Sequence, residues 1–172
     1  GYSCGHTLHD LVCKYLPHGS ALDEDELYEI LGSEFLASMH WHEDVMPIED
    51  ATDVVSRLAQ AYTLHVATAR QTSSRPVVET LLQRFYPNCI SDIHFVWEHL
   101  GNKEFKGVPK KEFVRQLGKP TYAYVDDNPK ETREIIGLTP HVILFDPDGH
   151  HVGVTDASHR VANWREIEKL LL

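Results

Sequence analysis

The feature that most limits the possible folds of this chain is a regular alternation of strand-like and helix-like segments from residue 49 onward. Short runs rich in β-branched and aromatic residues alternate with amphipathic stretches whose apolar side chains recur at helical spacing. Parallel strands need helical crossovers of this kind, whereas antiparallel strands can be joined by tight turns. The alternation therefore predicts an α/β fold with an open parallel sheet and right-handed connections. The predicted strands cover residues 63–69, 91–97, 121–127 and 141–146, and the predicted helices cover residues 49–62, 74–87, 109–118, 128–137 and 163–172.

Polar side chains follow several of these predicted strands at the point where each strand ends. Ligands of open parallel sheets bind beyond the carboxyl ends of the strands, so we expect these side chains to share one edge. The helix that precedes the third predicted strand adds two lysines near the same edge. The side chains concerned are Thr68 and Arg70, Asp126 and Asp127, Asp146, and the two lysines, Lys110 and Lys111.

These residue types suit the chemistry of a phosphate group. A hydroxyl and a backbone N–H at a strand end can hold a phosphate oxygen, and a lysine can neutralise its charge. A carboxylate at the neighbouring strand end can hold Mg²⁺, which keeps several waters and bridges to substrate phosphate. Together the groups predict a phosphoryl-transfer site that lacks only its nucleophile. Taken singly, each also has an ordinary interpretation: Thr68 as a strand residue, the lysines as a solvated helix start, and the aspartates as the start of an Asx-type turn.

Four stretches of the chain resemble the haloacid dehalogenase superfamily, and within it the 5′(3′)-deoxyribonucleotidase-like branch. The stretch LHVATARQTSSRPVVETLLQRFYP is similar to the second motif of that branch, and KKEFVRQLGKPTYAYVDDNPKE is similar to its third and fourth motifs. The segments VILFD and RVANWREI resemble its closing strand and C-terminal helix. The resemblance implies a Rossmannoid three-layer sandwich at residues 48–172, a small helical cap at residues 20–47, and a remnant of the first motif region at residues 1–19.

The resemblance also implies a function and a role for individual residues. It implies a Mg²⁺-dependent phosphatase that acts on a nucleoside monophosphate or another small phosphoester through an aspartyl-phosphate. Thr68, with Ala69 and Arg70 beside it, would bind the phosphate. The lysine of the family would be Lys110, with Lys111 as the alternative.

The same resemblance assigns the metal ligands and a residue of the cap. Asp127 would be the main Mg²⁺ ligand and Asp126 its acidic neighbour. Trp41, from the predicted cap, could stack on a nucleobase, as aromatic side chains do.

The chain departs from the family at the first motif, an apolar strand ending in Asp-x-Asp-Gly-Thr/Val-Leu. The nearest remnant is SCGHTL, which places Ser3 at the nucleophile and Gly5 at the acid/base position. Either the strand lies upstream of Gly1, or the motif has decayed and the protein is a non-catalytic binding or scaffold protein. The missing strand would lie between those ending at Thr68 and Asp127, and losing a central strand would leave two unpaired edges. We therefore expect an N-terminal segment or another chain in that position, and direct pairing of the two strands would contradict this.

Charge and cysteine content exclude several classes of partner. The chain of 172 residues has a formal net charge of −10, which disfavours nonspecific binding to a nucleic-acid polymer or an anionic membrane. Three cysteines without a CxxC motif, no signal-peptide pattern and no long apolar run predict a cytoplasmic protein. A cluster of Cys4, His6, His9 and Cys13 could bind zinc, but fortuitous clustering explains it as well.

Overall fold

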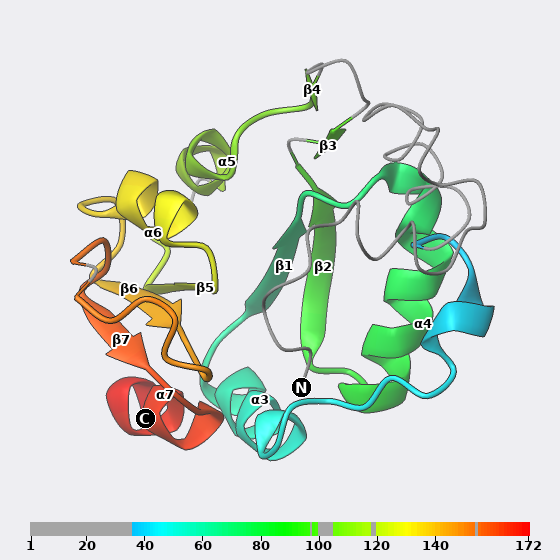
Figure 1. Cartoon of the computed structure of the whole chain (residues 1–172), viewed down its shortest axis with the longest axis horizontal. Helices are drawn as coiled ribbons and strands as arrows, with labels where there is room; N and C mark the ends of the chain where they lie inside the picture. The colour runs from blue at the N-terminus through cyan, green and yellow to red at the C-terminus, as the bar shows by residue number, and fades with distance from the viewer. Residues whose placement is uncertain (1–35, 97, 100–104, 118–119, 154) are drawn as a thin grey trace.

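The computed structural model describes residues 36–96, 98–99, 105–117, 120–153 and 155–172 (Figure 1). The predicted remnant at residues 1–19 and most of the predicted cap at residues 20–47 lie outside these ranges, as does the Cys4–Cys13 cluster. None of the helices in the described ranges is long and apolar enough to cross a bilayer. The described elements are η3 (Met39–His42), α3 (Ala51–Ala61), β1 (Leu64–Thr68), η4 (Thr72–Ser74), α4 (Arg75–Phe85), β2 (Ile90–Phe95), β3 (Glu98–His99), β4 (Phe105–Lys106), α5 (Lys110–Gln116), β5 (Ala123–Asp126), α6 (Pro129–Ile135), β6 (His141–Phe145), β7 (His159–Val161) and α7 (Trp164–Leu171).

All four predicted strands and all five predicted helices from residue 49 onward are present in the structure, within a few residues of their expected ends. Local sequence accounts for several of these ends. The side chain of Asn163 accepts a hydrogen bond from the backbone N–H of Glu166, as expected for an N-cap, and Asn128 caps α6 through Lys130 in the same way. Short strands β3, β4 and β7 were not predicted, because two or three residues are too few to show a period.

The carboxyl-terminal half of the chain forms a parallel sheet in the order β5–β6–β7. Strand β6 is paired on both sides, and its Val142, Ile143 and Leu144 are fully buried. Because successive residues of a strand point to opposite faces, β6 supplies apolar side chains to two cores at once.

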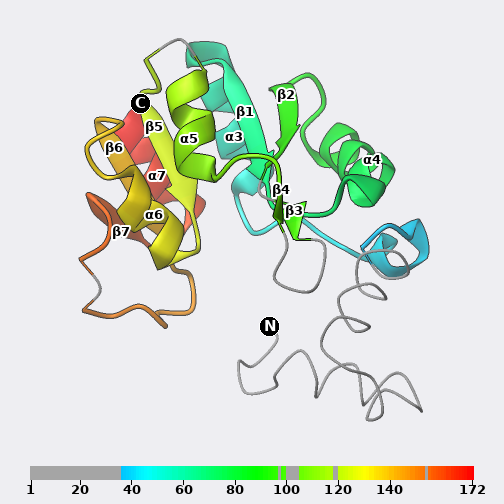
Figure 2. The same cartoon turned by 90° about the horizontal axis from the view of Figure 1, so that it is seen from above.

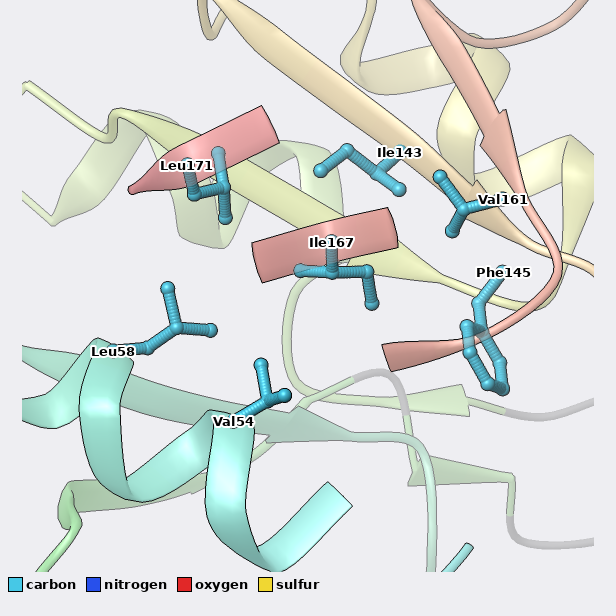
Figure 3. Close-up of a cluster of buried hydrophobic side chains, with 7 residues drawn as sticks. All are labelled: Val54, Leu58, Ile143, Phe145, Val161, Ile167 and Leu171. Carbon is cyan, nitrogen blue, oxygen red and sulfur yellow. The ribbon is translucent and has the colours of Figure 1, made fainter. Parts of the chain in front are cut away.

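Helices cover both faces of this sheet. One core packs α3 and α7 against the sheet (Figure 3), and the other packs α5 and α6 against the opposite face. The sheet therefore has the three layers of an α/β sandwich. The first core consists of Val54, Leu58, Ile143, Phe145, Val161, Ile167 and Leu171, and the second of Val114, Ile135 and Val142.

The amino-terminal half of the described chain forms a separate parallel pair, β1–β2, and an antiparallel pair, β3–β4. The single sheet predicted from the sequence is thus divided among the described residues, because β1 and β5 do not pair with each other. In Figures 1 and 2, β1 lies on the side of β2 that is nearer to β5. The unpaired edge of β1 and the unpaired edge of β5 therefore belong to the same interval between the two sheets.

Two aromatic ring contacts between described residues reach across this interval. The rings of Tyr62, just before β1, and Tyr122, just before β5, stack with centroids 5.3 Å apart. The ring of Phe113 on α5 lies 4.5 Å from that of His94 on β2. The two sheets are therefore in contact through side chains, although no backbone ladder joins them in the described part of the chain.

Candidate functional site

The best-defined polar cluster lies at the carboxyl end of β5. Lys110, the first residue of α5, donates a hydrogen bond of 2.7 Å from Nζ to Oδ2 of Asp126, the last residue of β5. The Tyr124 hydroxyl donates to the same oxygen at 2.6 Å, and the backbone N–H of Asn128 donates to Oδ1 at 2.9 Å. Both Lys110 and Asp126 are mostly shielded from solvent. These donors hold the Asp126 carboxylate in one orientation.

The electrostatics of this cluster keep the Tyr124 phenol protonated. Burial raises the pKa of Tyr124 far above its usual range, and the nearby Asp126 carboxylate raises it further, so the phenol remains a neutral donor. Burial also raises the pKa of Glu131, which the Lys110 ammonium opposes and Asp126 reinforces. The cluster contains one lysine beside three acidic side chains, those of Asp126, Asp127 and Glu131. A second cation would therefore be favoured at this edge.

The two adjacent aspartates differ in what they could offer to such a cation. Both oxygens of Asp126 already accept hydrogen bonds, whereas Asp127 is exposed at the strand end. Mg²⁺ is usually held by one or two carboxylates together with waters and substrate phosphate, so Asp127 fits the role of a principal ligand. Within the described ranges, no group of three His, Cys, Asp or Glu side chains is arranged to hold a metal. The donor set is thus compatible with Mg²⁺ only if waters, phosphate or further carboxylates complete it.

A second polar group lies at the carboxyl end of β1. The Thr68 hydroxyl accepts a hydrogen bond of 3.2 Å from the backbone N–H of Arg70, and the Thr68 carbonyl accepts one from Val96. Nη1 of Arg70 is buried and has no hydrogen-bond partner among the described residues. Burial also lowers the pKa of Arg70. A buried guanidinium N–H without an acceptor is costly, which makes this strand end suitable for an anion.

The structure brings together some of the predicted site residues and leaves others apart. Lys110 and Asp126 are in direct contact, and Ala69 is exposed beside Thr68. No described contact joins the Thr68–Arg70 group to the Lys110–Asp126 pair, because the two strands belong to different sheets. Lys111 is half-buried next to Lys110.

Trp41 lies in a different part of the molecule from these groups. Its side chain is 53% exposed in η3. Arg84 of α4 donates a hydrogen bond to the carbonyl of Glu43, which holds this segment against α4. The segment (blue in Figures 1 and 2) lies on the outer side of α4 in both views, away from α5 and β5. Trp41 therefore does not join the polar cluster in this structure.

Asp146, the third predicted strand-end acid, has a structural role. It is buried, and its two oxygens accept the backbone N–H groups of His150 and His151 at 2.9 and 3.0 Å. Gly149, with φ of 70°, donates its N–H to the Asp146 carbonyl, which closes a turn around Asp148 and Gly149. Asp146 thus organises the loop after β6.

Sequence reasoning missed Tyr124 and Glu131 as members of the cluster. Tyr124 precedes Asp126 by two positions, so both point to the same face of β5, and that spacing was the available signal. Glu131 lies in the first turn of α6, directly after the strand end. Comparisons of the chain with protein-family models, curated proteins and solved structures found no match.

Proposed function

We propose that this chain forms most of a Mg²⁺-dependent phosphatase of the haloacid dehalogenase type, acting on a nucleoside monophosphate or another small phosphoester. The observation that carries the proposal is the Lys110–Asp126 pair at the end of β5, beside the exposed Asp127. A lysine held by one carboxylate next to a second, exposed carboxylate is an arrangement that suits a phosphate and its metal ion together.

Each strand end would contribute one part of the reaction. Arg70 and the Thr68 hydroxyl would bind phosphate oxygens at the end of β1, where the guanidinium has a buried N–H without an acceptor among the described residues. Lys110 would neutralise charge on the transferring phosphoryl group while Asp126 and Tyr124 keep its ammonium in place. Asp127 would hold Mg²⁺, which supplies charge stabilisation when bound.

The nucleophile has to come from outside these groups. The family uses the first aspartate of the motif Asp-x-Asp-Gly-Thr/Val-Leu, and this sequence does not contain that motif in full. Neither Asp23-Glu24-Asp25 nor Asp146-Pro147-Asp148 is followed by Gly-Thr/Val-Leu. We propose that a strand carrying the motif occupies the interval between β1 and β5. Two observations support this: β1 and β5 each have an unpaired edge among the described residues, and the two edges belong to the same interval. A strand placed there would bring its carboxyl end between the Thr68–Arg70 group and the Lys110–Asp126 pair.

Peptide complementation tests the proposal. The chain would be mixed with a synthetic apolar peptide of about ten residues that ends in Asp-x-Asp, a typical length for a strand. Binding would be followed by fluorescence anisotropy and hydrolysis of p-nitrophenyl phosphate by absorbance, with Mg²⁺ or with EDTA. We expect no metal-dependent turnover by the chain alone, and turnover with the peptide that EDTA abolishes.

Matched controls separate binding from catalysis. A peptide ending in Asn-x-Asn should bind equally well without turnover. Asp127→Asn should abolish turnover, whereas Asp148→Asn, an exposed acid outside the cluster, should not. Turnover by the chain alone that Asp127→Asn abolishes would contradict the missing nucleophile.

A second candidate is the non-catalytic binding or scaffold protein, and the absence of the full motif Asp-x-Asp-Gly-Thr/Val-Leu from the sequence favours it. In that case the Asp-x-Asp peptide would bind without any hydrolysis. Phosphate would still bind to the chain, and Arg70→Gln would weaken that binding.

A further inference from the structure

Two histidines on the β1–β2 pair lie with their ring nitrogens facing each other. Nδ1 of His65 on β1 is 3.3 Å from Nε2 of His94 on β2. The ladder pairs His65 with Asp92 and Ala67 with His94, so both histidines and Asp92 are on the same face of the two strands. The phosphoryl-transfer chemistry proposed above does not use any of these three side chains.

The distance between the two nitrogens matches an edge of a metal coordination sphere. With metal–nitrogen bonds of 2.0–2.1 Å, two imidazoles on a tetrahedral zinc ion have their nitrogens about 3.3 Å apart. The ring of His94 is held by contact with Phe113, whereas His65 is exposed and open to solvent. One ligand is therefore positioned by packing and the other is accessible to an incoming ion.

The carboxylate of Asp92 lies beside the two histidines on this face. Oδ2 of Asp92 lies 3.4 Å from Nε2 of His94, while its Oδ1 accepts the backbone N–H of Ile93. The negative charge of Asp92 would favour a cation between the imidazoles. The three side chains do not surround a common point, in keeping with the absence of a preformed three-residue group from the described ranges. The site would thus have two protein ligands, with water in the remaining positions.

A second histidine pair in the same structure provides a comparison. Nδ1 of His141 and Nε2 of His159 are 3.4 Å apart on β6 and β7. Tyr122 packs against His141, and neither histidine forms an ion pair with a carboxylate in the described part of the chain. A short distance between ring nitrogens therefore does not by itself indicate a metal site. The His65–His94 pair differs from the other pair by the nearby carboxylate of Asp92 and by the exposed ring of His65.

We propose that His65 and His94, with Asp92 adding charge, bind a divalent transition-metal ion such as Zn²⁺, Ni²⁺ or Cu²⁺. Imidazole ligands select this class of ion, whereas the oxygen-rich cluster at Asp127 suits Mg²⁺. An ion bound to both histidines would connect β1 to β2 through side chains. The ion would thereby stabilise the two-stranded β1–β2 sheet, which has fewer paired strands than the β5–β6–β7 sheet.

Paramagnetic NMR of the full chain locates the site directly. Substoichiometric Cu²⁺ should broaden the amide signals of residues 64–67 and 92–95 first. His65→Asn, at an exposed position, should remove this broadening, and the matched variant His141→Asn should leave it unchanged. Broadening centred on residues 141–159 or on the amino-terminal histidines, or broadening that persists in His65→Asn, would overturn the proposal.

Calorimetric titration with Zn²⁺ gives the affinities. Loss of an outer-shell partner typically lowers metal affinity by about 10- to 100-fold, so Asp92→Asn should cost about tenfold and His65→Asn or His94→Asn about 100-fold or more. Zn²⁺ should also raise the thermal unfolding midpoint of the unmodified chain and not that of His65→Asn. Equal affinities for the unmodified chain and His65→Asn would show that the close nitrogens are only a hydrogen-bonded histidine pair.

Discussion

Strands β1 and β6 are both five residues long and parallel to a neighbour, yet their surroundings differ sharply. Strand β6 is paired on both sides and covered by helices on both faces, and its three central residues are fully buried. Among the described strands, β1 is paired only with β2, and none of its residues is fully buried. Burial therefore follows from the neighbours of a strand more than from its own residues.

The comparison explains how the polar groups are distributed. The Lys110–Asp126 pair belongs to the closed half of the molecule, where buried donors hold the carboxylate in place. The Thr68–Arg70 group belongs to the open half, where a buried guanidinium N–H lacks a partner among the described residues. Hydrogen bonds thus already fix the Lys110–Asp126 part of the candidate site. In the Thr68–Arg70 part, one guanidinium N–H has no acceptor among the described residues.

The largest expected effect tests the difference in packing directly. Ile143→Ala on β6 should lower the free energy of unfolding by about 3–4 kcal/mol, because it leaves a cavity in a closed core. Val66→Ala on β1 should cost about 1 kcal/mol or less, because the side chain is only half-buried. Urea denaturation of the two variants measures both values. Similar losses would show that β1 is packed as tightly as β6.

The loop after β6 provides a second test, with a dependence on pH. Burial opposes ionisation of Asp146, but the N–H groups of His151 and His150 outweigh it and lower its pKa. Asp146→Asn loses an ionic acceptor and should lower the free energy of unfolding by about 2 kcal/mol at neutral pH.

The sign of the pH effect follows from the direction of that shift. A lowered pKa in the folded state contributes stability above the unfolded value of about 3.9, and this stability is lost as pH falls through the folded pKa. Urea unfolding at a series of pH values from neutral to acidic should therefore show the difference between Asp146→Asn and the unmodified chain shrinking at acidic pH. Asp148→Asn, whose side chain is largely exposed, is the matched control and should show no such difference.

The aromatic stack between the two sheets should contribute less to the free energy of unfolding. Tyr62 and Tyr122 stack, and a double-mutant cycle with Tyr62→Leu and Tyr122→Leu should give a coupling of about 1 kcal/mol in urea unfolding. Tyr62 also donates a hydrogen bond to the carbonyl of Leu171, so its single variant should be the more destabilised of the two. A coupling near zero would mean that the two sheets unfold independently of this stack.

The smallest expected effect concerns the edge of β5 that has no strand partner in the described part of the chain. Val125 is 38% exposed, and Val125→Thr should change the free energy of unfolding by about 0.5 kcal/mol or less. If a strand binds in the interval between β1 and β5, it should shield position 125, and the threonine hydroxyl would then weaken binding of the complementing peptide. Equal peptide affinity for both chains would argue against binding beside β5.

Much of this fold was predictable from local patterns in the sequence. Helix α3 buries Ala51, Val54, Val55 and Leu58, the stripe expected from helical spacing. The Asn163 cap and the turn at Gly149 also follow from local chemistry. The contact between Lys110 and Asp126 was less predictable, because the two residues are sixteen positions apart with a helix end and a turn between them, and only packing brings the two side chains together.

The sequence by itself determined the order of helices and strands, their ends, and the chemical character of the strand ends, because these depend on residues that are close along the chain. Only the tertiary structure decided that β1 and β5 do not pair with each other and that Tyr124 and Asn128 hold Asp126. It likewise decided that Asp146 accepts hydrogen bonds from its own loop. It also decided that His65 and His94 face each other across two strands. These features depend on which segments become neighbours in space, and a single sequence read by its local periodicity does not contain that information.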